Sequence, residues 1–152
     1  MKFKKDVKNM VMVTLGTGIG GGIIIDKKIY IGSGEAGEIG HMCVVANGKK
    51  CACGANGCWE CYASATALVN MTAQAAKENP ESILAKIVDK NGEADGKTVF
   101  EAVSKACPVG KAVLDEYISY LAVGIKNLVN VFNPEVIVIS GGLSEAGDAL
   151  YA

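Results

Sequence analysis

Short runs of β-branched residues occupy the first part of the chain. Residues 10–15, 22–25 and 29–31 are runs of this kind, and each has the length of a strand. A short polar segment at residues 26–28 separates the last two runs, as the connection of a hairpin does. The pattern therefore predicts a three-stranded antiparallel meander over residues 10–31.

A helical period replaces these runs from residue 63 onward. Apolar side chains recur at spacings of three and four, which is the period of one helix face. Pro80 suits a first helical position, and Thr98 with Glu101 forms a capping box. The apolar stripe of the last and longest helix is interpreted as core. The predicted helices span residues 63–79, 80–89, 98–106 and 109–132.

A strand and a glycine pair follow the last helix, which is predicted to end before Pro134. Residues 136–139 are apolar at every position, which predicts a strand covered on both faces. Gly141 and Gly142 follow, and the polar stretch from Ser144 predicts a helix start. A strand, a Gly-Gly bend and a helix N-terminus let a nucleotide approach the backbone closely. A tight turn without a ligand explains the pattern equally well.

A glycine-rich segment, Gly16–Gly22, lies between the first two predicted strands. It contains the spacing G-x-G-x-x-G, but a strand follows it where a dinucleotide-binding motif needs a helix. It also lacks the Gly-Lys-Ser/Thr ending of a P-loop. Such a turn can still place backbone N–H groups against a phosphate, with the Thr17 hydroxyl as an added donor. A flexible hairpin tip is the competing interpretation.

One histidine and three cysteines lie close together in the chain, with a glutamate at each end of the set. Thiolate and imidazole are the ligands that Zn²⁺ takes most often, in a tetrahedron. Two intervening glycines allow the backbone to turn tightly enough for the sulfurs to meet. The donors are His41, Cys51, Cys53 and Cys58, and the flanking acids are Glu38 and Glu60.

Buried thiols and disulfides are the alternatives to a metal. Cys51 and Cys53 are too close in sequence to bridge each other without strain, and the N-terminus contains no secretory signal. A reducing, cytoplasmic compartment is expected, which favours metal over disulfide. Three cysteines are left over and are interpreted as ordinary, partly buried residues: Cys43, Cys61 and Cys107. Of these, Cys43 is the main competitor for a ligand position.

Length and charge narrow the possible functions. The chain has 152 residues, which suits one domain or a piece of one. A net charge of −1 argues against a nucleic-acid surface. No apolar run approaches the roughly 20 residues of a membrane span. Residues 1–9 form a lysine-rich lead-in to which we assign no function.

Taken together, these motifs resemble the C-terminal lobe of the ROK family, which comprises bacterial sugar kinases and sugar-responsive repressors. The resemblance covers roughly residues 10–148 and is most specific in the Gly-His and C-x-C-G-x-x-G-C-x-E combination. It implies an α/β fold of the actin-like ATPase (RNase H-like) class, and within the family it is greatest to the glucokinases. The segments that carry it are residues 15–22, 37–41, 51–60 and 139–142.

The resemblance also implies a role for each motif. A structural zinc ion would be held by His41 and the three cysteines, Cys51, Cys53 and Cys58. Sugar hydroxyls would be bound by Glu38, His41 and Glu60. The phosphates of ATP, with Mg²⁺, would lie on Gly16, Thr17, Gly18 and Gly20, and the adenosine on Gly141 and Gly142. The expected partners are a hexose, with glucose first, ATP and further copies of the chain, but no membrane and no nucleic acid.

Two parts of the family pattern are absent from this sequence. One is the Asp-x-Gly-x-Thr phosphate motif, and the other is the Asn-Asp pair whose Asp acts as base on the sugar hydroxyl. We assign the base role to none of Asp26, Asp115 and Asp148. The chain is therefore expected to be an incomplete lobe, lacking the N-terminal lobe, with little or no kinase activity. A sugar-responsive repressor lobe is the alternative, and a non-catalytic zinc module a third hypothesis.

Overall fold

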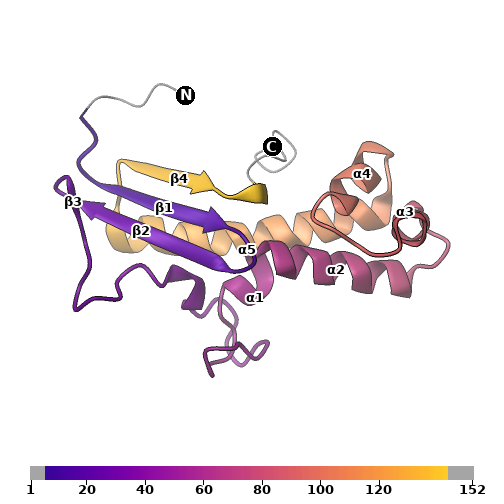
Figure 1. Cartoon of the computed structure of the whole chain (residues 1–152), viewed down its shortest axis with the longest axis horizontal. Helices are drawn as coiled ribbons and strands as arrows, with labels where there is room; N and C mark the ends of the chain where they lie inside the picture. The colour runs from indigo at the N-terminus through magenta and orange to yellow at the C-terminus, as the bar shows by residue number, and fades with distance from the viewer. Residues whose placement is uncertain (1–5, 144–152) are drawn as a thin grey trace.

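The computed structural model describes residues 6–143, and Figure 1 shows a sheet flanked by helices. Four strands form one mixed sheet in the order β3-β2-β1-β4. β1 runs antiparallel to β2 and parallel to β4, and β2 runs antiparallel to β3. The predicted α/β class and the antiparallel meander are therefore confirmed. The strands are β1 (Met10–Leu15), β2 (Ile19–Ile25), β3 (Lys28–Ile29) and β4 (Val136–Ser140).

The meander differs from its prediction at two places. β2 begins at Ile19, because Ile19 pairs with Leu15 across the sheet, so only residues 16–18 connect β1 and β2. β3 is shorter than predicted and pairs only with the end of β2. Asp26 and Lys27 both have positive φ, as a two-residue hairpin turn requires.

The helices pack together beside and beyond the sheet. α5 runs along the sheet and continues to the group formed by α2, α3 and α4 (Figure 1). One hydrophobic cluster joins the inward side chains of β1, such as Val13, to α5 side chains such as Leu121 and Leu128. The helices are η1 (Ile39–His41), α1 (Glu60–Ala63), α2 (Ala65–Glu78), α3 (Ile83–Asn91), α4 (Thr98–Ser104) and α5 (Pro108–Phe132).

Several predicted helix boundaries are wrong because side-chain caps decide them. The helix predicted over 63–79 breaks at Ser64, whose hydroxyl accepts a hydrogen bond from the Ala67 N–H and caps α2. α3 begins after a second serine cap, Ser82, so Pro80 is not its first residue. Thr98 does not begin a capping box with Glu101: the Asp95 carboxylate accepts from the N–H groups of Lys97 and Thr98, and the Thr98 hydroxyl accepts from the Asp95 N–H.

The predicted last strand is confirmed, but its predicted burial on both faces is not. Every residue of β4 is half-buried, because β4 lies at the edge of the sheet within residues 6–143. The helix start predicted at Ser144 lies outside the described residues. Over the same range, no helix is both long enough and apolar enough to cross a membrane.

Candidate functional site

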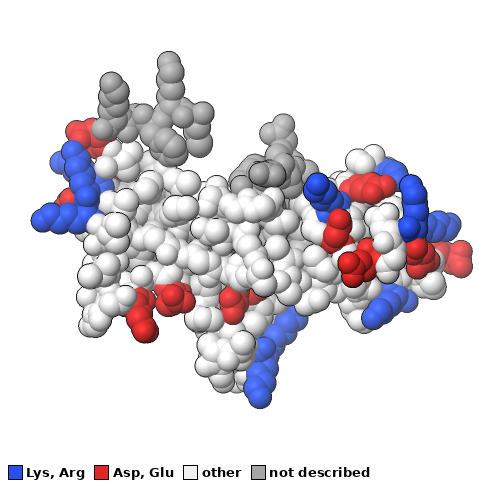
Figure 2. Space-filling view, in the orientation of Figure 1, with Lys and Arg blue, Asp and Glu red and all other residues white. Residues whose placement is uncertain are grey.

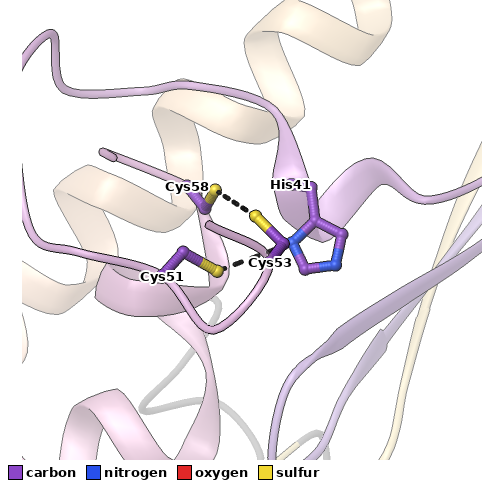
Figure 3. Close-up of side chains that lie close together, drawn as sticks. All are labelled: His41, Cys51, Cys53 and Cys58. Carbon is purple, nitrogen blue, oxygen red and sulfur yellow. Dashed lines mark hydrogen bonds between the residues drawn. The ribbon is translucent and has the colours of Figure 1, made fainter. Parts of the chain in front are cut away.

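Four potential metal ligands meet in one place. The ligand atoms of His41, Cys51, Cys53 and Cys58 all lie within 4.8 Å of one another. His41 comes from the end of η1, and the cysteines come from the loop between η1 and α1. Figure 3 shows the four side chains pointing toward a common centre. The predicted donor set is thus brought together by the fold.

Two backbone bridges and two glycines shape the loop that carries the cysteines. Residue 43 bridges to residue 58, and residue 50 bridges to residue 56. Gly54 and Gly57 have φ of 95° and 80°, which is the left-handed region that favours glycine. A Cβ at Gly57 would lie 1.8 Å from the carbonyl oxygen of Val45. The glycines therefore give the chain the bends that turn the sulfurs inward.

The spacing of the donors suits tetrahedral zinc. Cys53 Sγ lies 3.6 Å from Cys58 Sγ, and Cys51 Sγ lies 3.7 Å from His41 Nδ1. A tetrahedron with metal–sulfur bonds of about 2.3 Å has sulfur–sulfur edges of about 3.8 Å. A disulfide would need about 2.05 Å between sulfurs, and all six cysteines are free. The donor types and their separations therefore fit Zn²⁺.

The local environment changes the pKa values of the thiols in opposite directions. Burial raises the pKa of Cys58 to about 12, and burial also raises the pKa of the neighbouring Cys61 to about 11. The backbone N–H of Ala55 lowers the pKa of Cys53, with smaller effects from Cys51 and Cys58. A bound cation would favour the thiolate at each ligand position and release protons on binding.

The three remaining cysteines take other positions. Cys43 is exposed and bonds weakly to the carbonyl of Val45, so its sulfur lies outside the set of four. Cys107 caps α5 by accepting from the Gly110 N–H, which gives this residue a specific structural contact. Cys61 is half-buried beside the site.

The flanking acids lie on two sides of the imidazole. Glu60 Oε1 lies 3.6 Å from His41 Nδ1 and accepts a 3.2 Å hydrogen bond from Cys51 Sγ. Glu38 Oε2 lies 3.9 Å from His41 Nε2. The side chain of Glu60 is 23% exposed and that of Glu38 is 72% exposed. Glu60 is thus held against the four potential metal ligands, whereas Glu38 is exposed to solvent beside the second ring nitrogen of His41.

The Gly-Thr-Gly connection of β1 and β2 reaches the same region. A Cβ at Gly18 would lie 2.6 Å from Glu60 Oε2, so only glycine leaves room for this carboxylate. Thr17 and Gly18 line a cavity of about 440 Å³ together with Glu60. Gly20, in contrast, lies within β2 and not in the connection. The fold therefore joins the predicted phosphate turn to one predicted sugar ligand.

The second glycine pair lies beside the same connection. β1 and β4 are parallel, so their carboxyl ends lie side by side at the same end of the sheet. A Cβ at Gly141, which has φ of 100°, would lie 2.3 Å from the carbonyl oxygen of Leu15. Gly142 has open space at its Cβ position. Gly141 thus lies against Leu15, the residue that precedes the Gly-Thr-Gly connection.

Trp59 anchors the cysteine loop to α5. Its ring is fully buried, and its indole N–H donates to the Tyr120 carbonyl at 2.9 Å. A Cβ at Gly124 would lie 1.9 Å from the ring, so α5 presents a glycine-sized gap to it. Trp59 stands between Cys58 and Glu60 in the chain. Its packing therefore fixes the positions of Cys58, a candidate metal donor, and of Glu60.

Several residues that line this cavity are absent from the sequence-based predictions. Lys49 and Lys50 stand in the cysteine loop, and Thr66 and Asn70 stand on α2. The lysine pair has one sequence feature that could have singled it out, since residues 39–59 hold no other charged residue except the histidine. Nothing in the helical pattern marks Thr66 or Asn70.

Comparison with known proteins places these features in context. The family profile of the ROK family matches residues 1–152. The chain is 46% identical over 145 residues to a glucokinase of Halalkalibacterium halodurans, covering 94% of the chain and 44% of that protein. It is 33% identical over 144 residues to the xylose repressor of Bacillus subtilis, covering 93% of the chain and 33% of the repressor.

A solved structure agrees with the fold. The crystal structure of a ROK family glucokinase from Streptomyces griseus, in complex with glucose and AMPPNP, superposes with a TM-score of 0.86 at 36% identity. The match covers 96% of this chain and 48% of the glucokinase chain. The chain thus spans about half the length of these two glucokinases and a third of the repressor.

Proposed function

Because this chain belongs to the ROK family, we propose that it is the C-terminal lobe of an ATP-dependent hexose kinase of the glucokinase type, with an actin-like ATPase fold. The similarity to glucokinases, at 46% identity, supports a sugar kinase. The observation that carries the proposal is the position of Glu60, which lies against both His41 and Gly18. The Glu60 carboxylate, the proposed sugar-binding group, thus contacts both a proposed metal donor and the proposed phosphate turn.

The metal in this proposal is a structural zinc ion. His41, Cys51, Cys53 and Cys58 would fill all four positions of a tetrahedron and would leave none for a reacting water. The ion would fix the cysteine loop and orient the imidazole. Coordination through Nδ1, the nitrogen near Cys51, leaves Nε2 on the Glu38 side.

Sugar recognition would come from the groups around that imidazole. His41 Nε2 and the carboxylates of Glu38 and Glu60 are hydrogen-bonding groups for adjacent sugar hydroxyls. A carboxylate can grip two neighbouring hydroxyls through charge-assisted bonds, and so distinguish epimers. Glucose is the hexose that we propose, and a bound metal would hold the three groups in a fixed relation.

The nucleotide would lie along the carboxyl end of β1. The backbone of Gly16, Thr17 and Gly18 would face the phosphates, and Gly141 with Gly142 would face the adenosine. Gly20, which lies in β2, is also proposed to contact the phosphates through its backbone. Magnesium would accompany the phosphates and neutralise charge during transfer.

Phosphoryl transfer also needs a base that orients the attacking hydroxyl. Asp26 lies in the β2–β3 turn, and Asp115 pairs with Lys111 on the exposed side of α5. Asp148 lies outside the described residues. We therefore propose that the 152-residue chain by itself has little or no kinase activity. Release of ADP that depends on both ATP and glucose, well above background, would contradict this.

The first experiment measures glucose binding by calorimetry on the zinc-loaded chain. Replacing Glu60 by Gln is expected to weaken glucose binding by about tenfold or more, because a charge-assisted hydrogen bond becomes a neutral one. Glu81→Gln, on an exposed residue before α3, serves as the matched control and should leave the affinity unchanged. Equal affinity in the wild type and both variants would refute the sugar role of Glu60.

A sugar-responsive repressor lobe is the second candidate, supported by the similarity to the xylose repressor of Bacillus subtilis. Both candidates use the metal and the sugar groups, and they differ in the nucleotide. Binding of ATP by the chain favours the kinase, whereas glucose binding without any ATP binding favours the repressor. The expected association of several copies and the cytoplasmic location remain predictions.

A further inference from the structure

A cavity of about 440 Å³ lies between the Gly-Thr-Gly connection, the cysteine loop and the start of α2. Its volume falls in the range of small-molecule sites, about 300 to 1,000 Å³. Glu60 is its one acidic residue and Lys49 and Lys50 are its two basic ones. The uncharged lining residues are Thr17, Gly18, Ala52, Cys61, Ser64, Thr66, Ala67 and Asn70.

The two lysines have no acidic partner in the part of the chain that the structure describes. The Lys49 ammonium lies 4.8 Å from the centre of the Tyr62 ring, and its backbone N–H donates to the Tyr62 hydroxyl at 2.6 Å. These contacts hold the loop while the charge stays uncompensated by a carboxylate. No ion pair of Lys50 occurs among residues 6–143. Neither ammonium group is therefore paired with a carboxylate in the described part of the chain, and that of Lys49 lies over the Tyr62 ring.

The charge of the loop is concentrated at this pair. Residues 39–59 contain no Asp or Glu, so Lys49 and Lys50 are the only charged side chains of the loop besides the metal donors. Figure 1 shows the loop projecting below α1, and Figure 2 shows blue side chains there. A zinc ion with three thiolates and a neutral imidazole carries one net negative charge. Together with the Glu60 carboxylate, that centre balances the two ammonium groups in number, but no carboxylate forms an ion pair with either lysine among residues 6–143.

We propose that Lys49 and Lys50 bind phosphate groups in this cavity, with an oligophosphate such as a nucleotide's triphosphate tail as the ligand class. The proposal rests on the proposed function, since Thr17 and Gly18 of the phosphate turn line the same cavity. The lysines supply charge, and the hydroxyls of Thr17 and Thr66 supply neutral donors. The cysteine loop thus contacts the phosphates as well as the sugar, and links the two substrates.

Titration calorimetry on the zinc-loaded chain tests this, with sodium tripolyphosphate, ATP and inorganic phosphate as separate ligands. The double variant Lys49→Gln, Lys50→Gln is expected to bind tripolyphosphate and ATP about tenfold more weakly or worse. The double change to Arg keeps both charges and should retain most of the affinity. Lys86→Gln, on an exposed face of α3, is the matched control and should change nothing.

Zinc content and glucose affinity, measured on the same variants, separate this inference from the proposed function. Unchanged zinc and glucose binding with weakened oligophosphate binding supports the phosphate role of the lysines. Equal oligophosphate affinity in the wild type and the Gln variant overturns it, as does a wild type that binds glucose but no oligophosphate. A wild type that binds neither glucose nor any phosphate overturns the proposed function as well.

The three ligands also identify the source of the phosphate. If the double Gln variant loses affinity for ATP and for tripolyphosphate by the same factor, the cavity is assigned to the triphosphate tail. If the variant loses affinity only for inorganic phosphate, the lysines bind a single phosphate group, such as that of a phosphorylated sugar. That result overturns the proposal of an oligophosphate ligand.

Discussion

Gly124 is the position where one added methyl group should disturb the site most. Its Cβ would lie 1.9, 2.3 and 2.4 Å from three carbons of the buried Trp59 ring. Ordinary contact needs about 3.5 Å or more, so the ring must move by more than about 1 Å. Overpacking of this kind costs about 1–3 kcal/mol, and disturbing the Trp59–Tyr120 hydrogen bond adds about 1 kcal/mol. The higher helix propensity of alanine offsets about 1 kcal/mol of this loss in the free energy of unfolding.

The net expectation is that Gly124→Ala lowers the free energy of unfolding by about 2 kcal/mol. Urea unfolding followed by tryptophan fluorescence measures it directly, because Trp59 is the single tryptophan. Ser119→Ala, on the exposed face of the same helix, should stay within about 0.5 kcal/mol of the wild type. Since Trp59 adjoins Cys58, zinc should also be lost more readily. A Gly124→Ala protein as stable as the wild type, with equal zinc retention, would refute the anchoring role.

Two further predictions concern the metal and pH. Cys53→Ala should lose both bound zinc and stability, because metal-binding energy is folding energy at such sites; metal analysis and thermal unfolding check this, and full zinc content would contradict it. The Thr98 hydroxyl lowers the pKa of Asp95, so this carboxylate stabilises the fold above its unfolded-state pKa and the gain disappears as pH falls below about 4. Asp95→Asn should therefore flatten the acid limb of the stability profile in urea titrations, and an unchanged limb would count against this contact.

Local patterns predicted the parts of the fold that depend on local interactions. The β-branched run at residues 10–15 and the apolar stripe of α5 each specify a face and a period, so β1 and α5 match their predictions closely. The boundaries at Ser64 and Ser82 did not follow from periodicity, because a single hydroxyl bonding to a backbone N–H decides them. β4 is half-buried because it lies at a sheet edge in the described chain, which its composition does not reveal.

The sequence by itself determined the candidate metal donors, since His41, Cys51, Cys53 and Cys58 lie within one short stretch that can close only as a loop. Only the tertiary structure decided that Gly18 faces Glu60, and that Lys49 and Lys50 line the same cavity as Thr17. The physical reason is that donors near in sequence are brought together by backbone bends. Residues far apart in sequence meet only when the sheet and helices pack, and that packing leaves no period in the sequence.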